Sequence, residues 1–172
     1  MDFTLRPWRT EDAADIVPHA NDPAVSGNQR DVFPYPYTLA DAEDYISACV
    51  ASEGKGQLCR AIVVDGRAAG SIGVFLGSDV YRRSAELGYW LGRAYWRQGI
   101  MSAAVKALCR EAFQSLDIVR VYAEPFAGNV GSRYVLEKAG FTLEGVLRKS
   151  VYKNGVLMDS CIYAKLREEA AT

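Results

Sequence analysis

The chain has 172 residues, 49% apolar and 24% charged, which is the balance of an ordinary globular domain. Its formal net charge is −1, from 20 basic and 21 acidic residues, and this argues against a general nucleic-acid-binding protein. The segment Met1–Pro7 has no signal-peptide pattern, and no apolar run approaches the length of a membrane span. We therefore expect one cytoplasmic domain over residues 1–172, a monomer or homodimer, without membrane or nucleic-acid partners.

Seven strands and four helices are expected in chain order. The predicted helices span residues 10–22, 38–52, 99–116 and 130–139. The first predicted strand is short and ends within residues 5–8. The other predicted strands span residues 59–64, 70–76, 85–91, 118–123, 142–152 and 156–166. Thr38 with Asp41 fits a helix N-terminal cap, and Asn154-Gly155 is a strong hairpin signal. These elements predict an α+β fold: a mixed, mostly antiparallel sheet of about seven strands with helices on both faces.

The strand over residues 85–91 alternates cleanly. Its apolar face carries Ala85, Leu87, Tyr89 and Leu91, and its other face carries Glu86, Gly88 and Trp90. A carboxylate on a strand that is otherwise typical of a core is a candidate general base. An ion pair with Arg82, Arg83 or another basic residue is an equally good interpretation of Glu86.

The cysteines and the single histidine give no sign of a metal site. No Cys-x-x-Cys pair occurs among the four cysteines, Cys49, Cys59, Cys109 and Cys161. Each lies in an apolar pattern, so buried free thiols are expected. His19 has no second histidine with which to share a metal, and a helix-surface or hydrogen-bonded histidine is expected.

Two segments carry the chemistry. In the first, Gly99 stands where a loop becomes a helix, and free N–H groups of the first turn can bind an anion such as pyrophosphate. One glycine before a helix is also typical of a plain helix N-terminus. The second segment runs from Asn129 to Phe141 and fits a capped helix, with Gly140 beyond its end. A capped helix does not require Ser132 in the first turn.

Together these segments resemble the GNAT acetyltransferases, and more narrowly the branch related to the ribosomal-protein N-terminal acetyltransferases RimJ and RimL. The resemblance covers nearly the whole chain and rests on several short motifs in order. They are Thr4–Trp8, Asn21–Pro23, Phe33–Tyr37, Glu86–Leu91, Trp96–Met101, Asn129–Ser132, Lys138–Phe141 and Arg148–Ser150.

The resemblance implies an N-acetyltransferase that moves acetyl from acetyl-CoA to a primary amine by direct transfer in a ternary complex, with no metal. It implies that the strand backbone at Tyr89, Trp90 and Leu91 pairs with the pantetheine arm. The pyrophosphate loop would comprise Arg97, Gln98, Gly99, Ile100, Met101, Ser102 and Ala103. Asn129 would bond pantetheine and Tyr134 would touch the cofactor. Arg133 or Lys138 could meet the adenosine 3′-phosphate, although solvated charges are an alternative.

The sequence departs from the family pattern at several positions. Trp96 and Met101 stand where the phosphate loop usually has Gln or Arg and Gly or Ala. Leu136 replaces a tyrosine that protonates the leaving thiolate, and Val151 replaces a RimL-type glutamate. Ser132 is the nearest hydroxyl on the same helix face and is the candidate acid, with Glu86 as the candidate base. A catalytically degenerate module that only binds acetyl-CoA is therefore an alternative.

The acceptor site is expected between residues 26–37 and the last hairpin. Asp31 could attract an ammonium group, and Phe33, Tyr35 and Tyr37 could wall the site. These side chains could equally close the end of the domain. A protein N-terminus, a peptide, a polyamine or a small amine would all fit.

Overall fold

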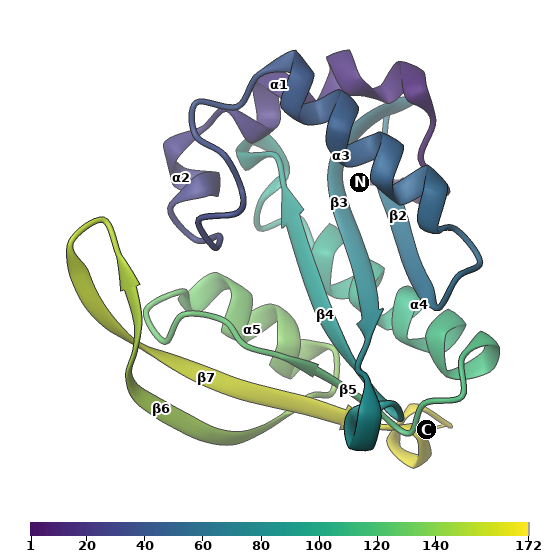
Figure 1. The fold of residues 1–172 in the computed structure, drawn as a ribbon, viewed down its shortest axis with the longest axis vertical. Coiled ribbons are helices and arrows are strands. Elements are labelled where there is room, and N and C mark those ends of the chain that lie inside the picture. Colours follow the sequence, from purple (N-terminus) through teal and green to yellow (C-terminus); the bar gives the residue numbers. More distant parts are fainter. Residues whose placement is uncertain (172) are drawn as a thin grey trace.

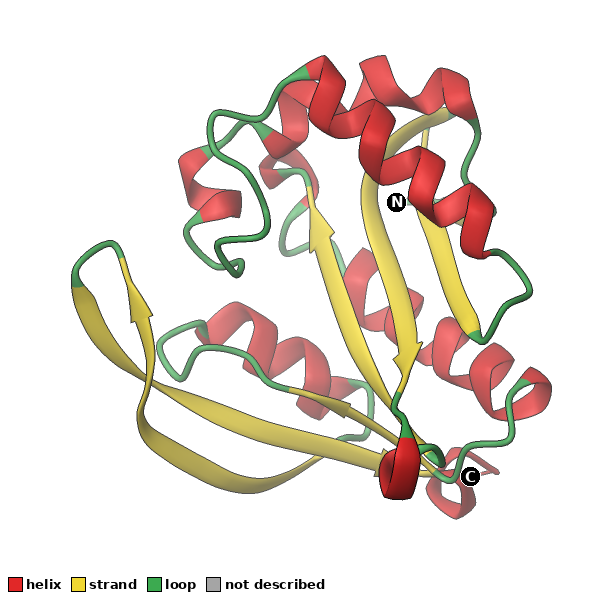
Figure 2. Ribbon diagram, in the orientation of Figure 1, coloured by secondary structure: helices red, strands yellow, loops and turns green. Residues whose placement is uncertain are grey.

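The computed structural model describes residues 1–171 and contains helices on both sides of one sheet (Figures 1 and 2). The α-helices are α1 (Ala13–Ala20), α2 (Pro23–Ser26), α3 (Leu39–Ser52), α4 (Ile100–Ser115) and α5 (Val130–Lys138). The strands are β1 (Phe3–Arg6), β2 (Gln57–Val64), β3 (Arg67–Leu76), β4 (Ser84–Leu91), β5 (Arg120–Ala123), β6 (Thr142–Lys153) and β7 (Val156–Leu166). The predicted α+β architecture is confirmed.

The sheet has seven strands in the order β1-β2-β3-β4-β5-β7-β6, and every neighbouring pair is antiparallel except β4–β5. The parallel pair is short. It joins Ser84–Glu86 of β4 to Arg120–Tyr122 of β5 and no further residues of either strand. Beyond Glu86 the two strands diverge, and β4 rises away from β5 in Figure 1. The sheet is therefore open at its centre.

Two apolar cores lie on opposite sides of the sheet. One core joins α1 and α3 to β2 and β3 and includes Ile16, Ile46 and Trp90. The other joins α4 and α5 to strands β2–β5 and β7 and includes Leu108 and Leu136. Because β2 and β3 contribute to both cores, their middle residues are buried on both faces. β4 contributes Ala85, Leu87 and Leu91 to one core and only Trp90 to the other, so its second side is covered near its end alone.

Local sequence signals explain where most elements begin. The Thr38 side chain accepts from the Asp41 N–H, and the Asp41 carboxylate accepts from the Thr38 N–H, which is the predicted capping box. Thr10 does not cap a helix. Residues Thr10–Asp12 form a 3₁₀ turn, because the Asp12 carboxylate binds the Arg9 N–H and the Arg6 guanidinium.

The short helix α2 was not expected. The Asn21–Pro23 corner ends α1 as predicted, but it also starts α2 at once. The Asp22 carboxylate accepts from the Ala24 N–H, and Pro23 occupies the first helical position, where its missing N–H costs nothing. The same three residues are therefore a stop signal and a start signal.

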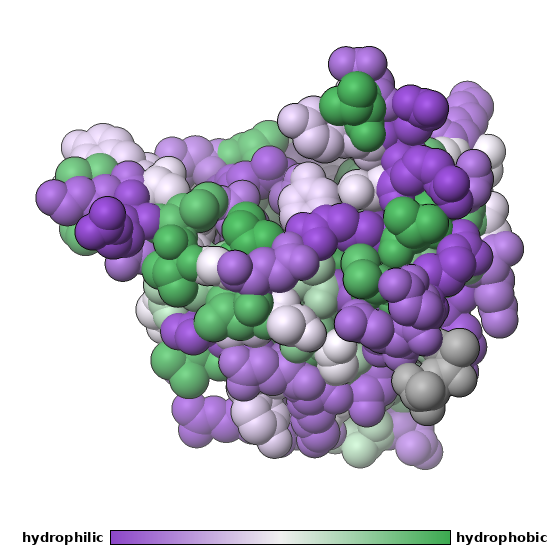
Figure 3. All heavy atoms as spheres, turned by 90° about the horizontal axis from the view of Figure 1, so that it is seen from below, coloured by the Kyte–Doolittle hydropathy of each residue, from purple (hydrophilic) through white to green (hydrophobic). Residues whose placement is uncertain are grey.

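The far edge of the sheet is uncovered. β6 is the edge strand, and its apolar residues Leu143, Val146 and Leu147 are exposed. Figure 3 shows this lower side of the molecule, where apolar residues form separate groups among polar ones. The hairpin of β6 and β7 extends toward the segment that follows α2 (Figure 1). The Lys153 ammonium lies 3.1 Å from the Asp31 carboxylate and ties the hairpin tip to that segment.

Candidate active site

A cleft of about 670 Å³ lies where β4 and β5 diverge. Five stretches of chain line it: the end of α2 with the residues after it, β4, the loop into α4, the residues after β5, and α5. They contribute Val25, Asn28–Arg30, Glu86–Leu91, Tyr95–Ser102, Ala123–Phe126, Gly128–Ser132, Tyr134, Val135 and Lys138. The cleft therefore collects most of the residues predicted to bind the cofactor, together with both candidate catalytic residues.

The N-terminus of α4 offers free main-chain donors to this cleft. Gly99 precedes the helix with φ = 79°, a conformation that L side chains rarely adopt, and an added Cβ there would meet no atom within 4 Å. In the described part of the chain no side chain caps this helix. The first four N–H groups, of Gly99 through Ser102, lack helical acceptors and carry the positive end of the helix dipole. This arrangement suits a phosphate group.

Ala103 lies outside this anion site. Its N–H already donates to the Gly99 carbonyl at 3.2 Å, as the first hydrogen bond of the helix, and the residue does not line the cleft. Within the predicted loop, the free N–H groups therefore end at Ser102. Arg97 also has a positive φ of 60° and lies in the loop that approaches Gly99.

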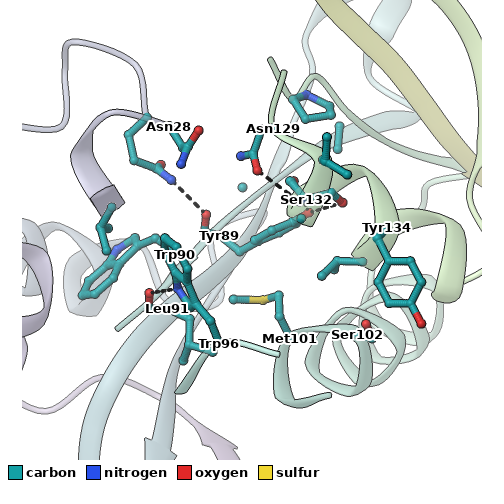
Figure 4. A pocket seen from close by; sticks show the side chains of 18 of the residues that line it. Asn28, Tyr89, Trp90, Leu91, Trp96, Met101, Ser102, Asn129, Ser132 and Tyr134 are labelled. Atoms are coloured by element: carbon teal, nitrogen blue, oxygen red, sulfur yellow. Dashed lines mark hydrogen bonds between the residues drawn. The ribbon is translucent and has the colours of Figure 1, made fainter. Parts of the chain in front are cut away.

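The main chain of β4 faces the cleft at alternate residues. The Gln29 amide donates to the Tyr89 carbonyl at 3.3 Å. The Trp96 indole N–H donates to the Leu91 carbonyl at 2.7 Å (Figure 4). A strand residue directs its N–H and C=O to the same side, so the N–H groups of Tyr89 and Leu91 also face the cleft. The side chain of Trp90 points to the opposite face, where it packs 5.7 Å from the Phe33 ring.

The hydrogen bond from the Trp96 indole to the Leu91 carbonyl explains the tryptophan at this position. The sequence places it where related loops have Gln or Arg, and its indole instead ties the loop before α4 to the end of β4. Gln29 does the same from the other side. The carbonyls of Tyr89 and Leu91 are therefore already bonded within the chain. The N–H groups of the same two residues remain as partners for a ligand.

Asn129, Ser132 and the Tyr89 side chain meet at the wall of the cleft that α5 forms. The Asn129 side-chain oxygen accepts from the Ser132 N–H at 3.1 Å, which caps α5, while its amide nitrogen points away from that bond (Figure 4). The Tyr89 hydroxyl lies 2.6 Å from the Ser132 hydroxyl and 3.3 Å from the Ser132 carbonyl. Burial raises the pKa of Tyr89, so its phenol is neutral at physiological pH. Leu136 is fully buried in the core and offers no chemistry.

Two carboxylates border the cleft beyond this wall. Glu86 is half-buried, and among residues 1–171 its side chain has no ion pair, so Arg82 and Arg83 do not neutralise it. Glu124 follows β5, and its carboxylate accepts from the fully buried Ser160 hydroxyl at 2.8 Å. Burial, and then the charges of Glu86 and Glu124, raise the pKa of Tyr122, which places both carboxylates around one side chain.

The four residues expected at the acceptor site, Asp31, Phe33, Tyr35 and Tyr37, lie outside the cleft lining. Asp31 pairs with Lys153. Phe33 packs against Trp90 and Tyr37, which is buried, and Tyr35 is exposed. Earlier residues of the same segment, Asn28–Arg30, line the cleft instead. The aromatic side chains close this end of the molecule more than they form the wall of a site.

The outer end of the cleft is lined by Tyr134 and Lys138. Tyr134 is exposed, and the Lys138 ammonium lies 5.8 Å from the centre of its ring. Arg133 turns away. Its guanidinium donates to the Tyr163 hydroxyl and the Ala127 carbonyl, at 3.1 and 3.2 Å, so it holds α5 in place. Of the two candidates for the 3′-phosphate, only Lys138 is available.

The remaining special residues are structural. All four cysteines are free and buried, as predicted. His19 is partly buried beside Tyr95, and burial lowers its pKa. Among residues 1–171 no group of His, Cys, Asp or Glu could hold a metal ion. Within the same range, no helix is long and apolar enough to cross a membrane.

Sequence reasoning did not consider Gln29, noted Glu124 after a buried strand without giving it a role, and saw Trp96 only as a departure. Glu124 directly after a buried strand is a usable signal, because strand ends meet at the opening of a sheet. Gln29 gives no such signal. It contacts β4 60 residues further along the chain, and only the folded arrangement brings the two together.

The fold and the cleft define a class of protein. The family described as an acetyltransferase (GNAT) domain matches residues 2–142. The chain belongs to this family.

Related proteins agree with this assignment. The chain is 36% identical over 108 residues to the putative ribosomal N-acetyltransferase YdaF of Bacillus subtilis, covering 63% of this chain and 58% of YdaF. It is 31% identical over 171 residues to the uncharacterized N-acetyltransferase p20 of Bacillus licheniformis, covering 98% and 95% of the two chains. Among solved structures, the microcin C7 self immunity acetyltransferase MccE, in complex with acetyl-CoA and AMP, superposes with a TM-score of 0.83. It is 25% identical, over 96% of this chain and 92% of MccE.

Proposed function

We propose that residues 1–172 act as one acetyl-CoA-dependent N-acetyltransferase domain that acetylates a primary amine by direct transfer in a ternary complex. One observation carries the proposal. A single cleft has free main-chain donors at the N-terminus of α4, a hydroxyl pair at Ser132 and carboxylates at Glu86 and Glu124. The main-chain donors suit a pyrophosphate, the hydroxyl pair suits a leaving thiolate, and the carboxylates suit an amine. The bound acetyl-CoA of MccE supports the choice of donor.

The residues of the cleft have distinct proposed roles. The N–H groups of Gly99 through Ser102 bind pyrophosphate, and Arg97 and Lys138 add positive charge. The free N–H groups of Tyr89 and Leu91 donate to the carbonyls of the pantetheine arm or to the thioester carbonyl, which they polarise. Holding both reactants in one cleft supplies much of the rate.

The proton transfers fall to side chains. Ser132 donates a proton to the thiolate as coenzyme A leaves. Glu86 takes the proton from the amine, directly or through water, since it is half-buried and has no ion pair with any of residues 1–171. Glu124 adds negative charge near the acceptor and favours an ammonium ion on arrival.

The acceptor amine stays open between three chemical classes. The name of YdaF points to a ribosomal protein, hence to a peptide N-terminus. A polyamine or another small amine also suits two carboxylates beside a cleft. The cytoplasmic location and the monomeric or homodimeric state stay predictions from the sequence.

An amine panel tests the function. The wild-type protein is incubated with acetyl-CoA and, separately, an N-terminal ribosomal-protein peptide, spermidine and a cyclic lipopeptide, and thiol release is followed. We expect release that depends on at least one amine. Calorimetric binding of acetyl-CoA without release in any mixture would favour the alternative, a module that binds the cofactor without catalysis.

Asn129 provides a separate test of cofactor binding. Asn129→Asp should keep the melting temperature, because aspartate caps a helix as well as asparagine does. It should weaken acetyl-CoA binding about tenfold, because the amide donor is replaced by a negative charge facing the ligand. Asn129→Ala should lose both stability and affinity. Unchanged affinity in the aspartate variant would limit Asn129 to its capping role.

A further inference from the structure

Tyr89 and Ser132 form a pair of hydroxyls that two different elements contribute to the cleft. Tyr89 comes from β4 and Ser132 from the first turn of α5, 43 residues later, and their oxygens are 2.6 Å apart (Figure 4). Resting on the proposed function, we infer that Tyr89 is a positioning residue: it orients the Ser132 hydroxyl and replaces the proton that Ser132 gives to the leaving thiolate.

The Tyr89 proton has two possible acceptors on Ser132, and we assign it to the nearer one, the hydroxyl. The Tyr89 hydroxyl lies 3.3 Å from the Ser132 carbonyl, which can only accept, and 2.6 Å from the Ser132 hydroxyl. In the described residues the Tyr89 hydroxyl has no partner outside Ser132. A proton donated to Ser132 leaves the serine's own proton free to turn into the cleft. The Ser132 main chain is meanwhile held by Asn129.

The chemistry favours a pair over a lone serine. An aliphatic hydroxyl is a weak acid, whereas phenols ordinarily titrate at about 10 and alkyl thiols at about 8.5. Burial raises the pKa of Tyr89 and weakens it as an acid, but a phenol behind the serine still brings the proton source closer to the thiol in acidity than an aliphatic hydroxyl alone. Two aligned hydrogen bonds also stabilise charge on sulfur before any proton has moved fully.

The step balances as follows. The amine nitrogen attacks the acetyl carbonyl carbon and forms the C–N bond. The C–S bond breaks and its electron pair goes to sulfur, which takes the Ser132 proton as an S–H bond forms. The Ser132 oxygen takes the proton of Tyr89, leaving a phenolate. The amine nitrogen loses one proton to Glu86 or water, and one proton returns through solvent to Tyr89. The net change is transfer of one proton from the amine to the thiol.

The test compares Tyr89→Phe, Ser132→Ala and the double variant in single-turnover acetyl transfer with an amine that the wild type uses. Tyr89→Phe should slow transfer about 10- to 100-fold. Its dissociation constant for acetyl-CoA should stay within about twofold, because the main chain of β4 is untouched. The double variant should be no slower than Ser132→Ala, because the tyrosine acts through the serine.

Tyr45→Phe is the matched control. The Tyr45 hydroxyl lies 2.7 Å from the Ser71 hydroxyl, in the core formed with α1 and α3 and outside the cleft lining. Its loss removes an equivalent Tyr–Ser contact and should leave transfer at the wild-type rate. The wild type should also show a curved dependence of rate on the deuterium content of the solvent, as two moving protons require, and Tyr89→Phe a linear one.

Several outcomes overturn the inference alone. They are a wild-type rate for Tyr89→Phe, losses for the two single variants that multiply in the double variant, or a linear solvent dependence for the wild type. The last measurement needs no variant and remains decisive if Tyr89→Phe fails to fold. Lack of transfer by the wild type with every amine would instead overturn the proposed function, and the inference with it.

Discussion

Replacing Ser132 with alanine should lower turnover about 100-fold while the affinity for acetyl-CoA barely changes. A group that protonates the leaving thiolate acts after binding, so its loss falls on the chemical step. The fold should survive, because the Ser132 N–H keeps its bond to Asn129. Tyr89 also keeps an acceptor in the Ser132 carbonyl. Ser132→Ala should therefore lower the free energy of unfolding by about 1 kcal/mol.

Ser71→Ala is a matched control for this experiment. It also removes a buried serine hydroxyl bonded to a tyrosine, and Ser71 does not line the cleft. We expect a similar change in melting temperature and no change in turnover. Wild-type turnover by Ser132→Ala would mean that proximity and main-chain polarisation suffice and that the assigned acid is wrong.

Gly99→Val should weaken acetyl-CoA binding by more than about tenfold. Two effects act together. A β-branched residue resists φ = 79°, at a cost of about 1–2 kcal/mol, so the loop shifts and its N–H groups lose their common direction. The new side chain also enters the open space before α4, where a phosphate would approach the backbone.

Gly66→Val separates these effects from a general loss of stability. Gly66 lies in the turn between β2 and β3 with φ = 81°, and an added Cβ there also meets no atom within 4 Å. The two variants should lose similar stability, but only Gly99→Val should lose affinity by calorimetry. Equal affinities would move the pyrophosphate away from α4.

The sequence predicts those parts of the site that depend on local pattern. Alternation along β4 places Tyr89 and Trp90 on opposite faces, and the structure shows them in different environments. A glycine before an apolar helix predicts the donors at α4, and Asn129 predicts the cap of α5. Each depends on residues within one or two turns of chain.

The remaining features depend on which groups the folded chain brings together, which no local pattern specifies. Trp96 could be recognised only as a departure, because its partner is a main-chain carbonyl and not a side chain. The Tyr89–Ser132 contact joins residues that are 43 positions apart in the sequence. It forms across the opening between β4 and β5, where α5 approaches β4. Asp31 carries the charge expected for binding an amine, yet it is paired with Lys153 from the hairpin tip.

A crystal structure of the wild-type protein with acetyl-CoA tests the central claim most directly. The account predicts pyrophosphate at the N–H groups of Gly99 through Ser102 and the thioester sulfur within hydrogen-bond reach of the Ser132 hydroxyl. It also predicts the Tyr89 hydroxyl behind that serine. An acetyl group lying outside the cleft between β4 and β5, or a sulfur remote from Ser132, would contradict it.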